Sequence, residues 1–107
     1  MKKELVYAIE DIKGEDEKAF CLKYFLIEEH MGALNGFGIC SYGIEIIKES
    51  LSGSESRAAM SISCDRQEVI ELILRMAKGM VTPSAFYDVL CDEIFKKSLD
   101  MCKTLCS

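Results

Sequence analysis

Hydrophobic positions in the first two thirds of the chain follow the period of two that is typical of β-strands. Residues 19–27, Ala-Phe-Cys-Leu-Lys-Tyr-Phe-Leu-Ile, differ from a half-exposed strand because apolar side chains stand at positions of both parities. A strand that is apolar on both faces needs cover on both faces. Two helical patterns follow it, which suffice for one face of a sheet, so we expect a partner on the other face.

The first two predicted strands form a hairpin whose connection is residues 13–18. Several cross-strand pairs agree with one register, which is why this hairpin is predicted. On one face that register pairs Leu5 with Leu26, Tyr7 with Tyr24 and Ile9 with Leu22, on the other it pairs Val6 with Phe25, and at the ends it pairs Lys3 with Glu28 and Lys2 with Glu29.

Asn35-Gly36 is the strongest turn signal, because both residues tolerate the positive φ of a type I′ turn. The turn lays residues 37–48 back along the second strand. This register pairs Ile27 with Ile44 and Phe25 with Ile46, and it puts Glu45 opposite Leu26. We expect a β-bulge at Gly43 to correct that mismatch.

Five small residues between Glu49 and Arg57 predict a mobile linker or a long hairpin tip. A fourth strand follows, in which one face is apolar and the other polar. Such a strand suits the edge of a sheet. Its predicted apolar positions are Ala58, Met60, Ile62 and Cys64.

Two helices end the chain. Asp65 and Glu68 have the spacing of a capping box, and the helical period that follows stops at Gly79. Thr82-Pro83 begins the second helix as an N-cap with proline at the first helical position. Its inward stripe is Phe86, Val89, Leu90 and Ile94, and a second stripe is Tyr87, Cys91, Phe95, Leu99 and Cys102.

The order of elements predicts an α+β fold: a four-stranded antiparallel sheet, mostly a meander, followed by two α-helices packed on one face. We expect a single domain over residues 1–107, with strands within 4–64 and helices within 66–104. The packing residues are predicted to be Val69, Ile73, Met76, Phe86, Leu90 and Ile94.

Composition limits the partners and the cellular compartment that we expect. The net charge is −5 and the basic residues are scattered, which disfavours nucleic acid as a partner. Acidic residues interrupt any signal-peptide core, no run of about 18 apolar residues exists to span a membrane, and the C-terminus lacks a prenylation signal. The six cysteines fall mostly inside strand and helix patterns, so we expect free thiols in a cytoplasmic protein.

His30 is the sole histidine and stands beside Glu28 and Glu29. A metal or a general base would be sought there first, but the sequence supplies no convergent ligands and no group to orient the imidazole. We therefore interpret the segment as a surface turn whose glutamates pair with lysines. Cys102 and Cys106 stand four residues apart, and two ligands do not make a site. We expect no metal, no cofactor and no catalytic residue.

Three short segments stand out within this order of elements: residues 42–46, Tyr-Gly-Ile-Glu-Ile, Thr82-Pro83, and residues 89–93, Val-Leu-Cys-Asp-Glu. With these segments the chain resembles a family of small uncharacterised bacterial proteins of the Clostridia type, a domain of unknown function. This resemblance covers most of residues 4 to 95. The resemblance implies a bacterial, cytoplasmic, stand-alone domain and carries no catalytic residues over to this chain.

For function, we expect a non-enzymatic interaction or regulatory module that forms a homodimer or binds a protein partner. Its predicted interface is the open sheet face with Val6, Phe25, Ile27, Ile44 and Ile46. One alternative is a small-ligand pocket between sheet and helices, lined by Tyr7, Tyr24, Phe86 and Tyr87. A less favoured alternative is an enzyme that uses a cysteine or His30 with Glu28, Glu29 or Asp92.

Overall fold

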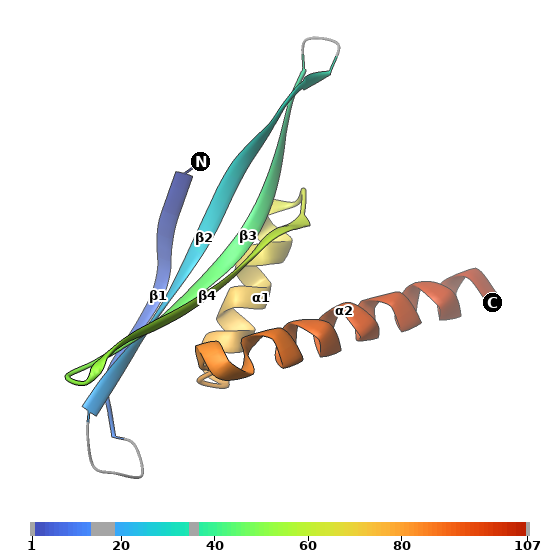
Figure 1. Cartoon of the computed structure of the whole chain (residues 1–107). Coiled ribbons are helices and arrows are strands. Elements are labelled where there is room, and N and C mark those ends of the chain that lie inside the picture. The colour runs from blue at the N-terminus through green and yellow to red at the C-terminus, as the bar shows by residue number, and fades with distance from the viewer. Residues whose placement is uncertain (1, 14–18, 35–36, 107) are drawn as a thin grey trace.

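The computed structural model describes residues 2–13, 19–34 and 37–106 of the chain; side chains are described except at 11, 31–39 and 95–106. Four strands precede two helices (Figure 1). Their bounds are β1 Lys2–Lys13, β2 Ala19–Leu34, β3 Phe37–Ser50, β4 Gly53–Ser63, α1 Arg66–Lys78 and α2 Pro83–Cys106.

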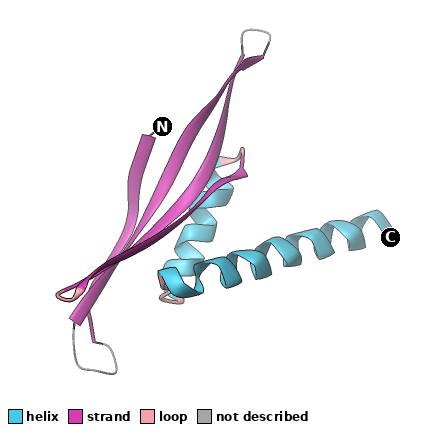
Figure 2. Ribbon diagram, in the orientation of Figure 1, coloured by secondary structure: helices cyan, strands magenta, loops and turns pink. Residues whose placement is uncertain are grey.

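The strands form one antiparallel sheet in the order β1-β2-β3-β4, a meander, which confirms the predicted α+β class. Helix α1 crosses the sheet and touches all four strands, whereas α2 lies against β3 and β4 (Figure 2). The radius of gyration is 16.0 Å, against roughly 13 Å for a compact domain of this length. The β2–β3 hairpin and the distal part of α2 project from the body and account for the excess (Figure 1).

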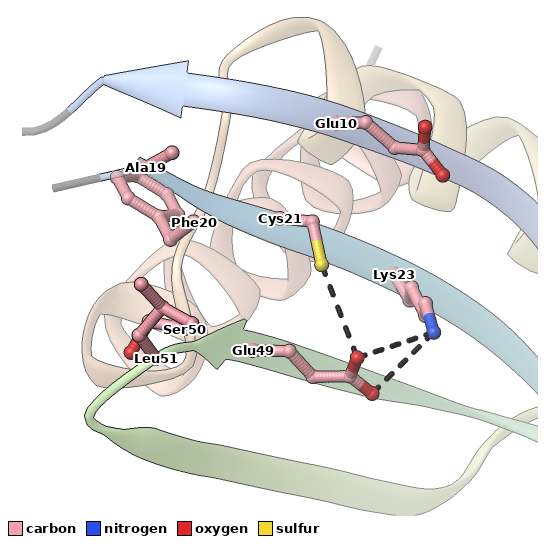
Figure 3. A pocket seen from close by; sticks show the side chains of 8 residues that line it. All are labelled: Glu10, Ala19, Phe20, Cys21, Lys23, Glu49, Ser50 and Leu51. Atoms are coloured by element: carbon pink, nitrogen blue, oxygen red, sulfur yellow. Dashed lines mark hydrogen bonds and ion pairs between the residues drawn. The ribbon is translucent and has the colours of Figure 1, made fainter.

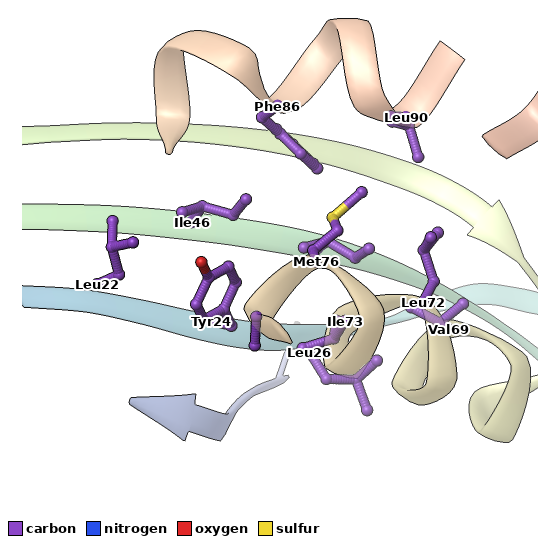
Figure 4. Close-up of a cluster of buried hydrophobic side chains, with 12 residues drawn as sticks. Leu22, Tyr24, Leu26, Ile46, Val69, Leu72, Ile73, Met76, Phe86 and Leu90 are labelled. Atoms are coloured by element: carbon purple, nitrogen blue, oxygen red, sulfur yellow. The ribbon is translucent and has the colours of Figure 1, made fainter. Parts of the chain in front are cut away.

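A single apolar core lies between the sheet and the helices (Figure 4). Tyr24, in the middle of β2, is fully buried, and its hydroxyl donates a hydrogen bond to the carbonyl of Val81 at 2.8 Å. That bond ties the loop between the helices to the sheet. The other buried members are Leu22, Leu26, Ile44, Ile46, Val69, Leu72, Ile73, Met76, Ala77, Phe86 and Leu90.

The β1–β2 register agrees with prediction in its middle and differs toward the N-terminus. Tyr7 pairs with Tyr24 and Ile9 with Leu22, as expected. A register shift between Leu5 and Tyr7 moves the rest by one residue, so the predicted partners of Lys2, Lys3, Leu5 and Val6 are wrong. The observed pairs there are Lys2 with Glu28, Lys3 with Ile27, Glu4 with Leu26 and Leu5 with Phe25.

The second hairpin shows a similar change of register. Leu34 pairs with Phe37 as the turn signal predicts, while Asn35-Gly36 lies outside the described residues. An irregularity between His30 and Ala33 then shifts the pairing by one residue. As a result, Ile44 pairs with Leu26, and Ile46 pairs with Tyr24, on the helix-covered face. The predicted pairs of Ile44 and Ile46 are therefore wrong.

Strand β4 begins earlier than expected, since a two-residue turn, Leu51-Ser52, joins it to β3. Of the two alternatives, the mobile linker is wrong and a hairpin is found, with a shorter tip than expected. The edge position of β4 is confirmed. The predicted apolar face is also wrong in part. Ala59 packs against the core while Met60 is exposed. Strand β4 carries two extra residues opposite Gly43, where Ser61 adopts a φ of 53°, and in this irregular stretch Ile62 packs against the same core as Ala59.

Gly43 does not form the expected bulge against β2, because it pairs regularly with Ile27. Its role is a close approach to β4 instead. A Cβ atom at this position would lie 2.3 Å from the backbone oxygen of Ala59, far inside van der Waals contact. Glycine is therefore required where β4 crowds β3.

Both helices begin where predicted. Asp65 caps α1 by accepting from the backbone N–H groups of Gln67 and Glu68. Pro83 follows Thr82 at the start of α2. Phe86 and Leu90 are buried as expected, but Ile94 is 50% exposed, so its place in the inward stripe is wrong. The reason is that α2 extends past the sheet (Figure 1). The side chains of Phe95, Leu99 and Cys102 lie outside the described residues.

Candidate functional site: a carboxylate, an imidazole and a thiol on β2 and β3

Three chemically reactive side chains meet on neighbouring strands. Glu28 and His30 are two residues apart on β2 and share one face. Cys40 on β3 is the cross-strand partner of His30. The Cys40 Sγ lies 3.3 Å from His30 Nδ1, and His30 Nε2 lies 4.0 Å from Glu28 Oε1. One ligand atom from each of the three falls within 4.8 Å of the others.

Strand pairing places this cluster at the point where a four-stranded sheet becomes a two-stranded one. The last β1 partner of β2 is Lys2, opposite Glu28, and the last β4 partner of β3 is Ser63, opposite Tyr42. Beyond these pairs β2 and β3 continue together toward their turn. The cluster therefore sits at the base of the projecting hairpin, where water reaches it, and the side chain of His30 is 68% exposed.

The groups around Cys40 affect the pKa of its thiol and therefore its reactivity. Partial burial raises the pKa of Cys40 above its ordinary value, and the charge of Glu28 and a hydrogen bond from the thiol to that carboxylate raise it further. The order thiol, imidazole, carboxylate is that of a cysteine nucleophile with its base and orienter. An activated cysteine, however, has a lowered pKa. The environment of Cys40 does the opposite, which disfavours nucleophilic catalysis.

Sequence reasoning found His30 and Glu28 but missed Cys40. The register drawn from the Asn35-Gly36 turn places His30 opposite Ser41. The irregularity between His30 and Ala33 changes that partner to Cys40. Gly32 lies within this stretch, and a glycine inside a strand often marks a bulge. Sequence reasoning placed the bulge at Gly43 instead, and so it missed the convergence. Glu29 pairs with Ser41 on the other face, and Asp92 is exposed on α2, so neither joins His30.

The four residues predicted to line a ligand pocket do not share one. Tyr24 and Phe86 are fully buried core side chains. Tyr7 is an exposed residue on β1, and Tyr87 is an exposed residue on α2 whose hydroxyl donates to the carbonyl of Ala58 at 3.0 Å. The space between sheet and helices at these positions is thus filled by protein.

The residues predicted to form the partner interface divide between the two sheet faces. Ile44 and Ile46 are fully buried under the helices, and Val6 packs against the same core, so their assignment to the open face is wrong. Phe25 and Ile27 point to the open face, because they have the opposite parity to Tyr24 and Leu26 on β2. The open face is thus smaller in apolar area than the sequence predicts.

A depression of about 420 Å³ lies where β1, β2 and β3 meet near the β3–β4 turn (Figure 3). Lys23 and Glu49 form an ion pair at 3.3 Å in it, and the thiol of Cys21 lies 3.9 Å from the same carboxylate. These charged groups satisfy one another, which leaves little to recruit a polar ligand. The lining residues are Glu10, Ala19, Phe20, Cys21, Lys23, Glu49, Ser50 and Leu51.

A family model described as "Family of unknown function (DUF6514)" matches residues 3–96 of the chain. This match confirms the resemblance to an uncharacterised domain family, while a bacterial origin stays a prediction. No curated protein and no solved structure matches the chain. Among the described helices, none combines the length and apolar character needed to cross a membrane.

Proposed function

This chain belongs to DUF6514, a family of unknown function, and we propose that it is a small non-enzymatic interaction module that self-associates through the sheet face opposite its helices. The observation that carries the proposal is that both helices pack on one face of the sheet (Figure 1). Over the residues that the structure describes, the other face has no second layer. Domains usually bury a sheet face with apolar residues against another layer.

Apolar side chains stand together on the open face. Leu5 is 51% exposed and pairs with Phe25 across β1 and β2. Phe25 on β2 and Ile47 on β3 are each partly exposed, whereas Ile27 on β2 is only 4% exposed and adds little to this surface. A second layer would remove this surface from water, at about 25 cal/mol for each Å² of apolar area. The apolar strip is the centre of the proposed interface.

Charged side chains of both signs border the strip, and they argue for a second copy as the partner. Lys3 forms an ion pair with Glu45 and lies over the ring of Phe25, 4.9 Å from its centroid. Lys23 pairs with Glu49 farther along. A face with balanced lysines and glutamates can match its own two-fold copy, whereas a partner of one charge sign would leave half of these groups opposed to like charge.

The distal part of α2 supports association as well. Leu90 is buried, and Ile94, one helical turn later, is 50% exposed. The distal part of α2 extends past the sheet (Figure 1). Helices gain most of their stability from packing an apolar face, so a projecting helix benefits from a neighbour.

We further place the module in the cytoplasm of a bacterium, with no nucleic-acid or membrane partner. The support is the net charge of −5 and the free thiols of the described cysteines Cys21, Cys40, Cys64 and Cys91, which suit a reducing compartment.

Native mass spectrometry and light scattering of the reduced protein test self-association. The proposal expects a species at twice 12.0 kDa. Leu5→Lys should yield monomer, because it puts a charge into the apolar strip without touching the core. Leu74→Lys is the matched control, since Leu74 is 44% exposed on α1 and away from the open face. A wild-type monomer at about 100 μM, or equal dissociation by both variants, would overturn the proposal.

A further inference from the structure

We propose that Glu28, His30 and Cys40 bind one divalent metal ion of intermediate hardness, such as Zn²⁺. A fourth coordination position of the ion would be open to solvent. The site is distinct from the self-association surface. It lies on the opposite sheet face from Phe25 and Ile27, at the base of the β2–β3 projection.

The donor set points to this class of metal. The three side chains supply a sulfur, an imidazole nitrogen and a carboxylate oxygen, all of which Zn²⁺ accepts. Thiolate and imidazole ligands disfavour Mg²⁺ and Ca²⁺, which prefer oxygen. Three protein ligands with one free position is the pattern of zinc sites that bind water or another small molecule.

The spacing fits a single ion with small side-chain movements. In tetrahedral coordination with metal–ligand bonds of about 2.0–2.3 Å, ligand atoms stand roughly 3.3–3.6 Å apart. The Cys40 Sγ to His30 Nδ1 distance is already 3.3 Å. All three ligand atoms lie within 4.8 Å of one another, so Glu28 has to move closer to bind the same ion as Cys40 and His30.

All three proposed ligands lie on paired strands. His30 and Cys40 are held opposite each other by the β2–β3 ladder, and Glu28 is two residues from His30 on the same strand. Ligands on paired strands hold their relative positions better than ligands on loops. The partly exposed position also provides an entry path for the ion.

A divalent cation suits the charge of this donor set. The carboxylate of Glu28 and a thiolate at Cys40 are both anionic ligands. A bound divalent ion neutralises the pair and holds the thiol as thiolate. Of the basic residues nearby, Lys2 stands opposite Glu28 across β1 and β2, and Arg66 pairs with Glu4 at 2.8 Å.

Titration of the reduced full-length chain with Zn²⁺, and with Co²⁺ as a spectroscopic probe, tests the site. The background carries Cys102→Ser and Cys106→Ser, since these two residues stand four apart in the sequence and could bind metal on their own. We expect one Zn²⁺ per chain and a thiolate-to-cobalt charge-transfer band in the near ultraviolet. The band reports direct coordination by sulfur.

Cys40→Ser and His30→Ala should each weaken Zn²⁺ binding at least tenfold, and Cys40→Ser should abolish the charge-transfer band. Cys91→Ser is the matched control, because Cys91 is an exposed thiol on α2, and it should bind like the background. Exposure of His30 keeps His30→Ala folded, which circular dichroism checks. Equal affinity in Cys40→Ser and Cys91→Ser, or no binding at a millimolar concentration of Zn²⁺, would overturn the proposal. Loss of dimers in the oligomer experiment would leave this outcome unchanged.

Discussion

His30 and Cys40 face each other as a cross-strand pair, with the imidazole Nδ1 3.3 Å from the thiol sulfur. Ten residues separate them in the sequence, and the β2–β3 hairpin brings them together. The pair exists because the register shifts by one residue between His30 and Ala33. Without that shift Ser41 would stand opposite His30, and the carboxylate, imidazole and thiol would not converge.

Tyr24→Phe should lower the free energy of unfolding by about 1–3 kcal/mol at neutral pH, because it leaves the carbonyl of Val81 without its hydroxyl donor. Urea denaturation measures the difference. Tyr7→Phe is the control: this residue pairs with Tyr24 but is exposed, so the change should be near zero. Equal losses in the two variants would contradict the assigned role of the hydroxyl.

The stability of the protein should fall in alkali because of the same residue. Burial raises the pKa of Tyr24 from its ordinary value of 10.0 to about 12. The folded state therefore holds the phenolic proton more tightly than the unfolded state. Its contribution is complete below pH 10 and is lost as the pH rises through about 12. Urea denaturation from pH 8 to 11.5 should show this loss in the wild type and a smaller loss in Tyr24→Phe; parallel curves would refute it.

Gly43→Ala should destabilise the fold by about 1–3 kcal/mol, since its new Cβ would be forced against the backbone of Ala59 on β4. Gly79→Ala provides the comparison. The nearest atom to a Cβ at Gly79 is 3.7 Å away and its φ is −86°, so alanine should cost little there. Thermal denaturation ranks the two variants, and the reverse order would show that the β3–β4 crowding is not rigid.

Met80→Gly should stabilise the protein, in contrast to most glycine substitutions. Helix α1 ends with backbone bonds from Met80 to Ala77 and from Val81 to Met76, a Schellman arrangement in which Met80 has a φ of 54°. Glycine adopts this conformation without the penalty of roughly 1–2 kcal/mol that other residues carry. Met80→Ala is the control, because it removes the exposed side chain but keeps the penalty. In chemical denaturation, Met80→Gly should have a higher free energy of unfolding than Met80→Ala.

Asp65→Ala should cost about 1 kcal/mol, because the first turn of α1 loses the acceptor for two backbone N–H groups. Asp65→Asn keeps an acceptor oxygen and should cost less. The hydroxyl of Ser63 links this cap to the helix by accepting from the backbone of Asp65 and donating to Glu68. Ser63→Ala should therefore also lower the free energy of unfolding. The effect of Ser63→Ala should be smaller in a protein that already carries Asp65→Ala. A double-mutant cycle with no coupling would argue against this link.

Much of the fold follows from local sequence pattern. The cap at Asp65, the helical period that follows it and the proline at the start of α2 predict both helices where they are observed. The strand patterns and the turn signal predict the meander, and Tyr7 is found opposite Tyr24 as expected. These features depend on neighbouring residues, so a sequence carries them directly.

The candidate site and the faces of the sheet follow from contacts that no local pattern encodes. Register shifts of one residue at Val6 and in the β2–β3 hairpin decide which side chains share a face, because such a shift turns every later side chain to the other side. They move Ile44 and Ile46 into the core. The sequence by itself determined the elements and their order; packing between strands and helices decided the register, and with it the convergence of His30 with Cys40.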